Sequence, residues 1–220
     1  MNEAKLIVIE GACDGIGKTT QYNLLNDYFK SLNKDVYNHH FPSYGTYQGK
    51  GVEKYLAGDF GNIKDISPYF INSLYAYDRF ITWYEELKKE YDAGKIIILD
   101  RYTTSSLIYQ SALIDDIEEK KKFIDWVIDY EYEKNGIKKP DIVIFLKAPY
   151  ELVSKMREER VDNEGIKNDI HEADNSFMRR VYDNALFVAD YLNWSIIECS
   201  KDNKMKSIHE IHEEIRKAIN

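Results

Sequence analysis

The sequence contains few cysteines and few prolines. Its 220 residues include two cysteines, Cys13 and Cys199, and four prolines. Two cysteines are too few for a disulfide framework, and they lack the spacing of a metal site, which favours a reducing compartment. Because neither a proline-rich linker nor a low-complexity tract interrupts the chain, we expect one domain over residues 1–220.

The sequence also lacks long apolar runs and an excess of positive charge. No stretch approaches the roughly 20 apolar residues of a membrane span, and the amino-terminal segment is typical of a strand and not of a leader. We therefore expect a cytoplasmic protein without a membrane partner. The net charge of −8 repels polyanions, so a nucleic-acid polymer is not an expected partner. Any phosphate must then be bound by a local cluster of cations.

Short apolar runs alternate with helical patterns along the chain. The runs occupy residues 5–9, 35–41, 95–99, 141–146 and 194–199. Their apolarity is mostly continuous, which indicates strands of a parallel sheet covered on both faces. The sequence therefore predicts a doubly wound α/β fold, in which ligands bind at the carboxyl ends of the strands.

The longest helical pattern covers residues 67–93. Apolar side chains recur in it at steps of four and three and form a stripe of Phe70, Leu74, Tyr77, Ile81 and Tyr84. Such a stripe faces either the core or a second subunit, and we favour the core because amphipathic core helices are common.

A glycine-rich segment, residues 11–20, joins the first strand to the first helix. Backbone N–H groups of such a loop bind phosphates, Lys18 would reach the β and γ phosphates, and the Thr19 hydroxyl would ligate Mg²⁺. The loop is one residue longer than the usual pattern, and we place the extra residue in a bulge at Ala12-Cys13. The predicted ATP-binding residues are Gly11, Asp14, Gly15, Ile16, Gly17, Lys18, Thr19 and Thr20.

An Asp-Arg pair follows the strand at 95–99. Asp100 is predicted at the carboxyl edge of the sheet, where a carboxylate can hold Mg²⁺ beside the phosphates of the loop. Arg101 is placed to bind two phosphate oxygens at once, and a surface salt bridge is the alternative.

These motifs, in this order, resemble thymidylate kinases, which belong to the nucleoside monophosphate kinase group of P-loop proteins. The resemblance covers essentially the whole chain. It implies a five-stranded parallel sheet with helices on both faces, a short lid, a homodimer, and Mg²⁺-dependent phosphorylation of dTMP to dTDP by ATP. The other matching pieces are Phe41-Pro42, Leu74-Tyr75-Ala76-Tyr77-Asp78-Arg79, Asp100-Arg101-Tyr102, Tyr109-Gln110, Lys139-Pro140-Asp141 and Leu192-Asn193-Trp194.

The resemblance also implies roles for single residues. Arg101 would hold the acceptor monophosphate, Arg79 would bind the thymine edge, Tyr75 would stack on the ring, and Asp14 would meet the 3′-hydroxyl. Plain helix packing remains the alternative for Tyr75. The full set of predicted substrate residues is Asp14, Phe41, Pro42, Tyr44, Tyr75, Arg79, Arg101, Ser105, Tyr109 and Gln110.

The lid is expected at about residues 157–171, with a mobile polar segment at 161–169. A lid must bring positive charge to the reacting phosphates. Arg157 and Arg160 share a helix face, and Lys167 and His171 follow. We expect both arginines to act with Lys18, Asp14 and Arg101 in catalysis, although pairing with Glu158, Glu159 or Glu164 is the alternative.

One departure from the family affects the substrate. Many thymidylate kinases carry an Arg after the Phe-Pro pair, whereas this chain has Ser43-Tyr44-Gly45-Thr46. Either Tyr44 donates a neutral hydrogen bond instead, or the site is not tuned to a monophosphate. A deoxynucleoside kinase with Glu10 as base therefore stays an alternative, as do another nucleoside monophosphate kinase and a non-catalytic nucleotide-binding protein.

Two histidine groups resemble metal sites only superficially. His209 and His212 are three residues apart, one fewer than a metalloprotease helix requires, and His39 and His40 are successive residues of a strand. We expect His209 and His212 to lie on a solvated helix face, and His39 and His40 to be structural.

Overall fold

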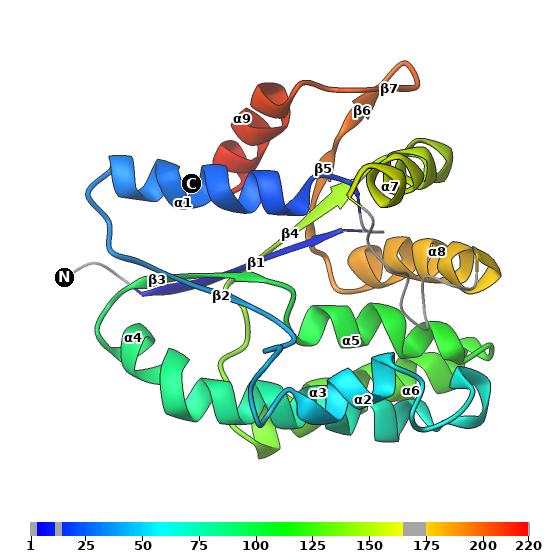
Figure 1. Cartoon of the computed structure of the whole chain (residues 1–220). Coiled ribbons are helices and arrows are strands. Elements are labelled where there is room, and N and C mark those ends of the chain that lie inside the picture. The colour runs from blue at the N-terminus through cyan, green and yellow to red at the C-terminus, as the bar shows by residue number, and fades with distance from the viewer. Residues whose placement is uncertain (1–3, 12–14, 165–174, 220) are drawn as a thin grey trace.

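The computed structural model describes residues 4–11, 15–164 and 175–219, with the backbone alone at 158–164. Five parallel strands form the central sheet in the order β2-β3-β1-β4-β5. Helices cover both faces, with α1 and α9 on one side and α5, α6 and α8 on the other (Figure 1). This arrangement confirms the predicted doubly wound α/β fold. The five strands are β1 (Lys5–Gly11), β2 (Val36–His40), β3 (Ile96–Asp100), β4 (Ile142–Lys147) and β5 (Ser195–Glu198).

The helices connect these strands and continue beyond them. The α-helices are α1 (Lys18–Ser31), α2 (Lys50–Leu56), α3 (Pro68–Thr82), α4 (Lys88–Asp92), α5 (Thr103–Tyr109), α6 (Ile117–Ile128), α7 (Tyr150–Glu164), α8 (Asn175–Tyr191) and α9 (Ile208–Ile219). Two π-helical segments, η2 (Trp83–Leu87) and η4 (Asp129–Lys134), follow α3 and α6. Short 3-10 turns lie at η1 (Ile63–Asp65) and η3 (Ser111–Leu113), and a small hairpin, β6 (Ser200–Lys201) with β7 (Lys204–Met205), precedes α9.

Successive residues of the central strand pack into two hydrophobic clusters. Ile7 and Ile9 belong to the larger cluster, while Leu6 and Val8 pack in the other cluster with Trp83. Because neighbouring side chains of a strand point to opposite faces, a strand buried on both faces must be apolar throughout. The continuous apolar runs in the sequence have this cause.

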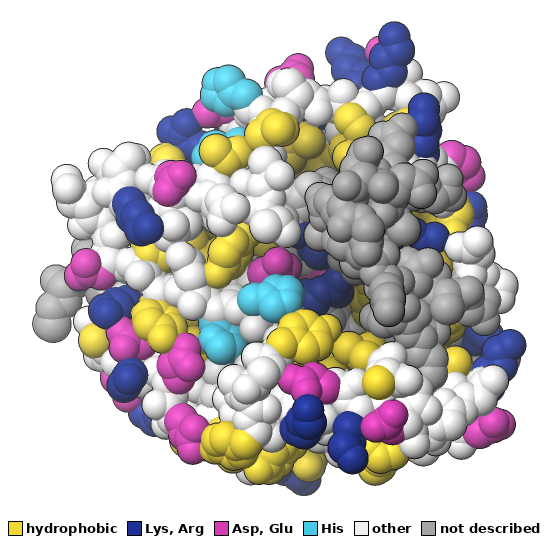
Figure 2. Space-filling view, viewed as in Figure 1, with side chains coloured by type: hydrophobic (Ala, Val, Ile, Leu, Met, Phe, Trp, Pro, Cys, Tyr) yellow, Lys and Arg dark blue, Asp and Glu magenta, His cyan; other side chains and the backbone are white. Residues whose placement is uncertain are grey.

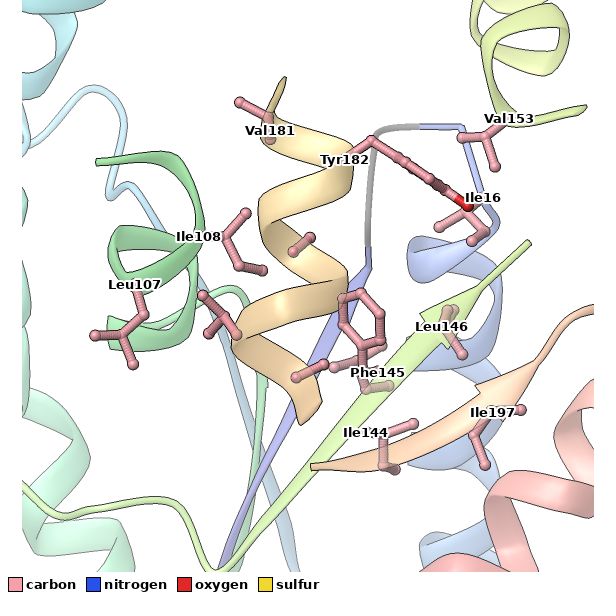
Figure 3. Close-up of a cluster of buried hydrophobic side chains, with 14 of the residues drawn as sticks. Ile16, Leu107, Ile108, Ile144, Phe145, Leu146, Val153, Val181, Tyr182 and Ile197 are labelled. Carbon is pink, nitrogen blue, oxygen red and sulfur yellow. The ribbon is translucent and has the colours of Figure 1, made fainter. Parts of the chain in front are cut away.

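The larger cluster reaches the loop that follows β1. Figure 3 shows Ile16 of this loop beside Val153 of α7, with the Tyr182 ring of α8 pointing toward them. All three side chains are buried. The loop is therefore anchored to the hydrophobic core through Ile16, which fixes the position of its backbone.

The long helical pattern at 67–93 forms one continuous run through α3, η2 and α4. Its aromatic stripe does not face the core as predicted. Phe70 is 44% exposed, Tyr77 49% and Tyr84 58%, while Leu74 and Ile81 are half-buried. The period of the pattern was right, but the three aromatic residues are on the outer side of the helix.

Two further observations concern the predicted lid and the predicted absence of membrane spans. Helix α7 continues to Glu164, so residues 161–164 of the expected lid segment are helical, and 165–171 lie outside the described residues. In the described part of the chain, none of the helices combines the length and the apolar character that a membrane crossing requires.

Candidate active site

The loop between β1 and α1 depends on glycine at three positions. Gly15 and Gly17 have φ of 92° and 95°, in the region that side chains avoid. A Cβ on Gly11 would lie 2.8 Å from Cγ2 of Ile16, and one on Gly15 would lie 3.1 Å from the backbone nitrogen of Arg157. The chain therefore turns tightly under α7 and enters α1 at Lys18. Asp14 and the proposed bulge at Ala12-Cys13 lie outside the described residues.

The amino end of α1 has the features of an anion site. The first turn carries no acidic residue, and no side chain caps the helix. Its N–H groups can therefore bind an anion supplied by a ligand. Lys18 is buried beside Gly11, and the side chains of Thr19 and Thr20 are exposed. This arrangement suits a bound phosphate chain.

Asp100 lies at the carboxyl end of β3, next to the end of β2. The sheet register pairs it with His40, and His40 Nδ1 lies 3.3 Å from Asp100 Oδ2. The other oxygen, Oδ1, is buried without a partner among the described residues. Burial by itself would raise the pKa of the Asp100 carboxyl, but the His40 hydrogen bond and the charges of Lys18 and Arg101 outweigh it and lower that pKa. An ionised carboxylate with one unpaired oxygen fits Mg²⁺.

Arg101 follows β3 in a strained backbone conformation. Its φ of 66° is uncommon for a residue other than glycine and is often found at functional sites. Its guanidinium lies 5.5 Å from the centre of the Tyr109 ring, so the two predicted substrate residues meet. Basic, acidic and histidine side chains gather near the centre of the face in Figure 2.

The segment after β2 is held by buried polar contacts. The Ser43 N–H donates to Asp78 Oδ2 at 2.8 Å, and the Ser43 hydroxyl contacts His39 Nε2 at 3.0 Å. Phe41 and Pro42 are buried, and Tyr44 is exposed. Tyr44 is therefore the predicted substrate residue of this segment whose side chain faces outward. His39 and His40 make separate contacts, and among the described residues no group of three or more His, Cys, Asp or Glu side chains is placed to hold a metal ion. His212 is buried, so the solvated face predicted for His209 and His212 is wrong for His212.

Arg79, predicted to bind the thymine edge, lies in a buried ion pair with Glu131. Arg79 Nε donates to Glu131 Oε2 at 2.7 Å, and Nη2 donates to Oε1 at 2.6 Å. Nη2 also donates to Ser106 Oγ at 3.0 Å. Tyr75, one turn earlier on α3, is half-buried and meets the Tyr55 ring edge-on at 6.2 Å.

Glu131 and Ser106 were missed by the sequence reasoning. Glu131 belongs to no sequence motif. It lies in the polar segment η4, 52 residues from Arg79 in the sequence. Only the approach of η4 to α3 in the folded chain brings the two together. Ser106 could have been found, because it is on the helix that carries Ser105 and Tyr109.

Ser105 and Glu10 form a second buried group. The Ser105 hydroxyl donates to Glu10 Oε2 at 2.6 Å, and the Thr104 hydroxyl donates to the same oxygen at 3.0 Å. Gly11 N donates to Glu10 Oε1 at 3.2 Å. Glu10 is fully buried, so its carboxylate ties α5 to the start of the loop. Gln110 is also buried, and its Oε1 has no partner among the described residues.

Helix α7 brings one predicted lid cation to the loop. Arg157 packs its backbone against Gly15, and its Nη2 donates to Asn175 Oδ1 at 3.0 Å. The Arg160 side chain, Lys167 and His171 lie outside the described residues. The carboxyl-terminal half of α7 therefore starts directly over the phosphate-binding loop.

Comparisons with known proteins find similarity to one family. A family model described as thymidylate kinase matches residues 9–215. The chain is 33% identical over 213 residues to a probable thymidylate kinase of Thermococcus onnurineus, covering 95% of this chain and 94% of the relative. It is 30% identical over 179 residues to the thymidylate kinase of Mycobacterium tuberculosis, covering 80% and 81%. The solved thymidylate kinase of Candida albicans has the same fold, with a TM-score of 0.74 and 23% identity over 99% of this chain and 91% of the other.

Proposed function

The chain belongs to the thymidylate kinase family, and we propose that it transfers the γ-phosphoryl group of ATP to dTMP, giving dTDP and ADP. The main observation in support of this proposal is that Lys18, Asp100 and Arg101 lie close together at the carboxyl edge of the sheet. A protein that only holds ATP does not need a strained arginine and a carboxylate with an unpaired oxygen beside its loop.

In this reaction a phosphate oxygen of dTMP attacks the γ-phosphorus. A new oxygen–phosphorus bond forms, and the bond from the γ-phosphorus to its bridging oxygen breaks, leaving the electron pair on ADP. The dTMP phosphate is already largely ionised near pH 7, so the step needs no general base from the protein. The work of the protein is positioning and charge stabilisation.

Each part of the site has a role in that work. The amino end of α1 and Lys18 hold the phosphates of ATP, and Arg101 holds the acceptor phosphate in line. Asp100 Oδ1 and the Thr19 hydroxyl are the groups that would hold Mg²⁺, which neutralises phosphate charge when bound. Arg157 is placed over the loop, where its charge would stabilise the transition state.

Two roles rest on the family alone, and a third rests on the departure of Tyr44 from it. We propose that Asp14 binds the 3′-hydroxyl of dTMP and that Arg160, with the rest of a lid at about 157–171, adds positive charge over the phosphates. Tyr44, exposed beside the acceptor side, would donate a neutral hydrogen bond to the monophosphate.

A deoxynucleoside kinase is less well supported. Such an enzyme must remove a proton from a 5′-hydroxyl, and Glu10 is its candidate base. Glu10 is fully buried and accepts hydrogen bonds from Thr104, Ser105 and the Gly11 N–H. A carboxylate that is occupied in this way holds the loop and is poorly placed to accept a substrate proton.

We also propose a cytoplasmic homodimer. The outer side of α3 and η2 carries Phe70, Tyr77 and Tyr84, all more than one third exposed and spaced seven residues apart. A second copy of the chain would cover this aromatic stripe. Sedimentation of the wild type and of a Tyr77→Glu variant tests this, since the variant should dissociate and an unchanged sedimentation coefficient would contradict the stripe as interface.

One assay tests the proposed function directly. ADP release is measured with ATP, Mg²⁺ and either dTMP, dUMP, dCMP or thymidine. We expect turnover with dTMP and none with thymidine. Turnover with thymidine alone would instead identify a deoxynucleoside kinase, and ATP binding without turnover would identify a nucleotide-binding protein.

A further inference from the structure

His39 links strand β2 to the segment that carries Tyr44. Its side chain is 15% exposed. The ring nitrogen Nδ1 lies 3.2 Å from Glu86 Oε1 of η2, and Nε2 lies 3.0 Å from the hydroxyl of Ser43. The Tyr37 hydroxyl donates to the same Glu86 oxygen at 2.7 Å. The imidazole of His39 therefore bridges a carboxylate and a hydroxyl.

The contacts of His39 define its tautomer. A carboxylate only accepts hydrogen bonds, so Nδ1 carries the ring proton and donates it to Glu86. Burial lowers the pKa of the His39 imidazole, and the opposing charge of Glu86 does not reverse this, so the ring is neutral near pH 7. Nε2 then has only a lone pair, and it must accept the hydrogen bond of the Ser43 hydroxyl.

Ser43 is held at each of its polar groups. Its N–H donates to Asp78 Oδ2 at 2.8 Å, and its carbonyl accepts from the Thr46 hydroxyl at 2.6 Å. Its hydroxyl donates to His39 and lies 3.2 Å from Thr82 Oγ1. Ser43 is also only 6% exposed. A residue that is fixed at its N–H, its hydroxyl and its carbonyl restricts the residue that follows it.

Tyr44 is that residue, and its backbone is placed beside the phosphate edge of the sheet. Its N–H donates to the carbonyl of Pro42 at 2.9 Å. At the start of the same segment, the Phe41 N–H donates to the carbonyl of Asp100 at 3.1 Å. The Tyr44 side chain is 55% exposed. The segment therefore combines a fixed backbone with an outward side chain.

An uncharged hydroxyl binds a phosphate more weakly than an arginine does. It therefore depends more on being held in place before the ligand binds. We propose that His39 is a positioning residue that, through Ser43, holds Tyr44 where its hydroxyl donates to the acceptor monophosphate. This inference rests on the proposed function, in which Tyr44 makes that contact. It assigns to the imidazole a role that neither ATP binding nor the hydrophobic core requires.

Two substitutions of His39 separate its two contacts. In His39→Asn the amide reaches only the position of Nδ1, so the contact with Glu86 is kept and that with Ser43 is lost. In His39→Gln the amide oxygen reaches the position of Nε2 and still accepts from Ser43. We expect His39→Asn to raise KM for dTMP about 5-fold, the effect of one hydrogen bond, with kcat and KM for ATP within about 2-fold of the wild type. His39→Gln should stay within about 2-fold for all three.

A double-mutant cycle with Tyr44→Phe tests the route through Tyr44. Tyr44→Phe removes the hydroxyl and should itself raise KM for dTMP about 5-fold. In that background His39→Asn should add less than about 2-fold, because His39 acts through the hydroxyl that is already absent. His209→Asn, at a histidine of α9 whose side chain is 83% exposed, is the control and should change neither KM nor kcat.

Several outcomes would overturn the inference. A folded His39→Asn enzyme with unchanged KM for dTMP would do so, as would a His39→Gln enzyme that is equally impaired. Equal rises in KM for ATP and dTMP, or effects of His39→Asn and Tyr44→Phe that multiply in the double variant, would indicate a structural role. If His39→Asn does not fold, Ser43→Ala, which removes the hydroxyl, is measured and judged in the same way. Wild-type enzyme without turnover of dTMP would instead contradict the proposed function itself.

Discussion

The proposed phosphate side and the proposed base side of the site surround their basic side chains in opposite ways. On the phosphate side, Lys18, Arg101 and His40 surround one carboxylate, Asp100, whose Oδ1 has no partner among the described residues. On the base side, Arg79 is enclosed and matched by Glu131 in a buried pair. The difference matches the proposed ligands, because charged phosphates need positive charge in excess and a neutral base needs only a fixed donor.

Replacing Arg101 and replacing Arg79 should have different effects on activity and on stability. Arg101 is half-buried and strained at the end of β3, where it can serve the ligand without supporting the core. Arg79 sits among buried side chains and supports the fold whether or not a ligand is present. Variants on the two sides should therefore separate activity from stability.

The largest effect is expected for Lys18→Ala on the phosphate side. The loss of this cation should lower kcat by roughly 10⁴-fold, within the range of other cations that act on a transferred phosphoryl group. The free energy of unfolding should fall by only about 1 kcal/mol, since the buried stem and the attraction to Asp100 are lost while the hydrophobic core is unchanged. Turnover is measured with ATP and dTMP, and unfolding with urea. Near wild-type turnover would show that Lys18 does not reach the phosphates.

Arg79→Met should mainly affect stability. It leaves Glu131 buried without its partner, which should lower the free energy of unfolding by about 3 to 5 kcal/mol. The double variant Arg79→Met with Glu131→Leu removes both charges and should recover most of the loss. Urea unfolding of both variants is the measurement. A double variant no more stable than the single one would contradict this account of the pair.

Arg101→Ala should mainly affect the acceptor. A lost charge-assisted contact of about 2 kcal/mol raises KM for dTMP by about 30-fold, with KM for ATP nearly unchanged. Stability should change little, because alanine meets the same strain at a φ of 66°. Steady-state kinetics with each substrate varied in turn is the measurement. An unchanged KM for dTMP would place Arg101 outside the acceptor site.

Tyr44→Arg adds a cation where this chain lacks one. A charged donor in place of a neutral one should tighten dTMP by about 1 kcal/mol, close to 5-fold, and leave thymidine binding unchanged. The affinities of the variant and the wild type for dTMP and for thymidine are measured by calorimetric titration. Equal affinities in variant and wild type would mean that this segment does not approach the phosphate.

The smallest effect concerns acid stability and Asp100. Because the pKa of this carboxyl is lower in the folded protein, its stabilisation is complete above the ordinary Asp range and is lost as the pH falls through the lowered value. His40→Phe removes part of the lowering, so the loss of thermal stability on acidification should be smaller in total and should end at a higher pH than in the wild type. Melting temperatures from about pH 2 to 6 test this against His209→Phe, an exposed control. Matching acid profiles would show that His40 does not act on Asp100.

Much of the fold was predictable because its signals are local. All five strands formed within two residues of the predicted runs. The signal is strongest in β1 and β3, because a strand covered on both faces must be largely apolar. Gly15 and Gly17 have the positive φ values that a phosphate-binding loop requires. Asp100 and Arg101 were placed correctly at the sheet edge because they follow directly after an apolar run.

Contacts between distant segments were not predictable in the same way. The helical period indicated that Phe70, Tyr77 and Tyr84 share a side, but not that this side faces outward. Ser105 was predicted to bind the substrate, but nothing in the sequence indicated that its hydroxyl donates to Glu10, 95 residues away. Periodicity relates residues within one element and carries no information about which element packs against it.

By itself, the sequence determined the order of strands and helices, the glycine loop and the charged residues at the strand ends, because each depends on neighbours a few positions away. Only the tertiary structure decided which of those charged residues pair with one another. The β2–β3 register set His40 against Asp100, and the approach of η4 to α3 set Glu131 against Arg79. Both pairs depend on packing across the molecule, since an ion pair forms only where the fold brings its partners within a few ångströms.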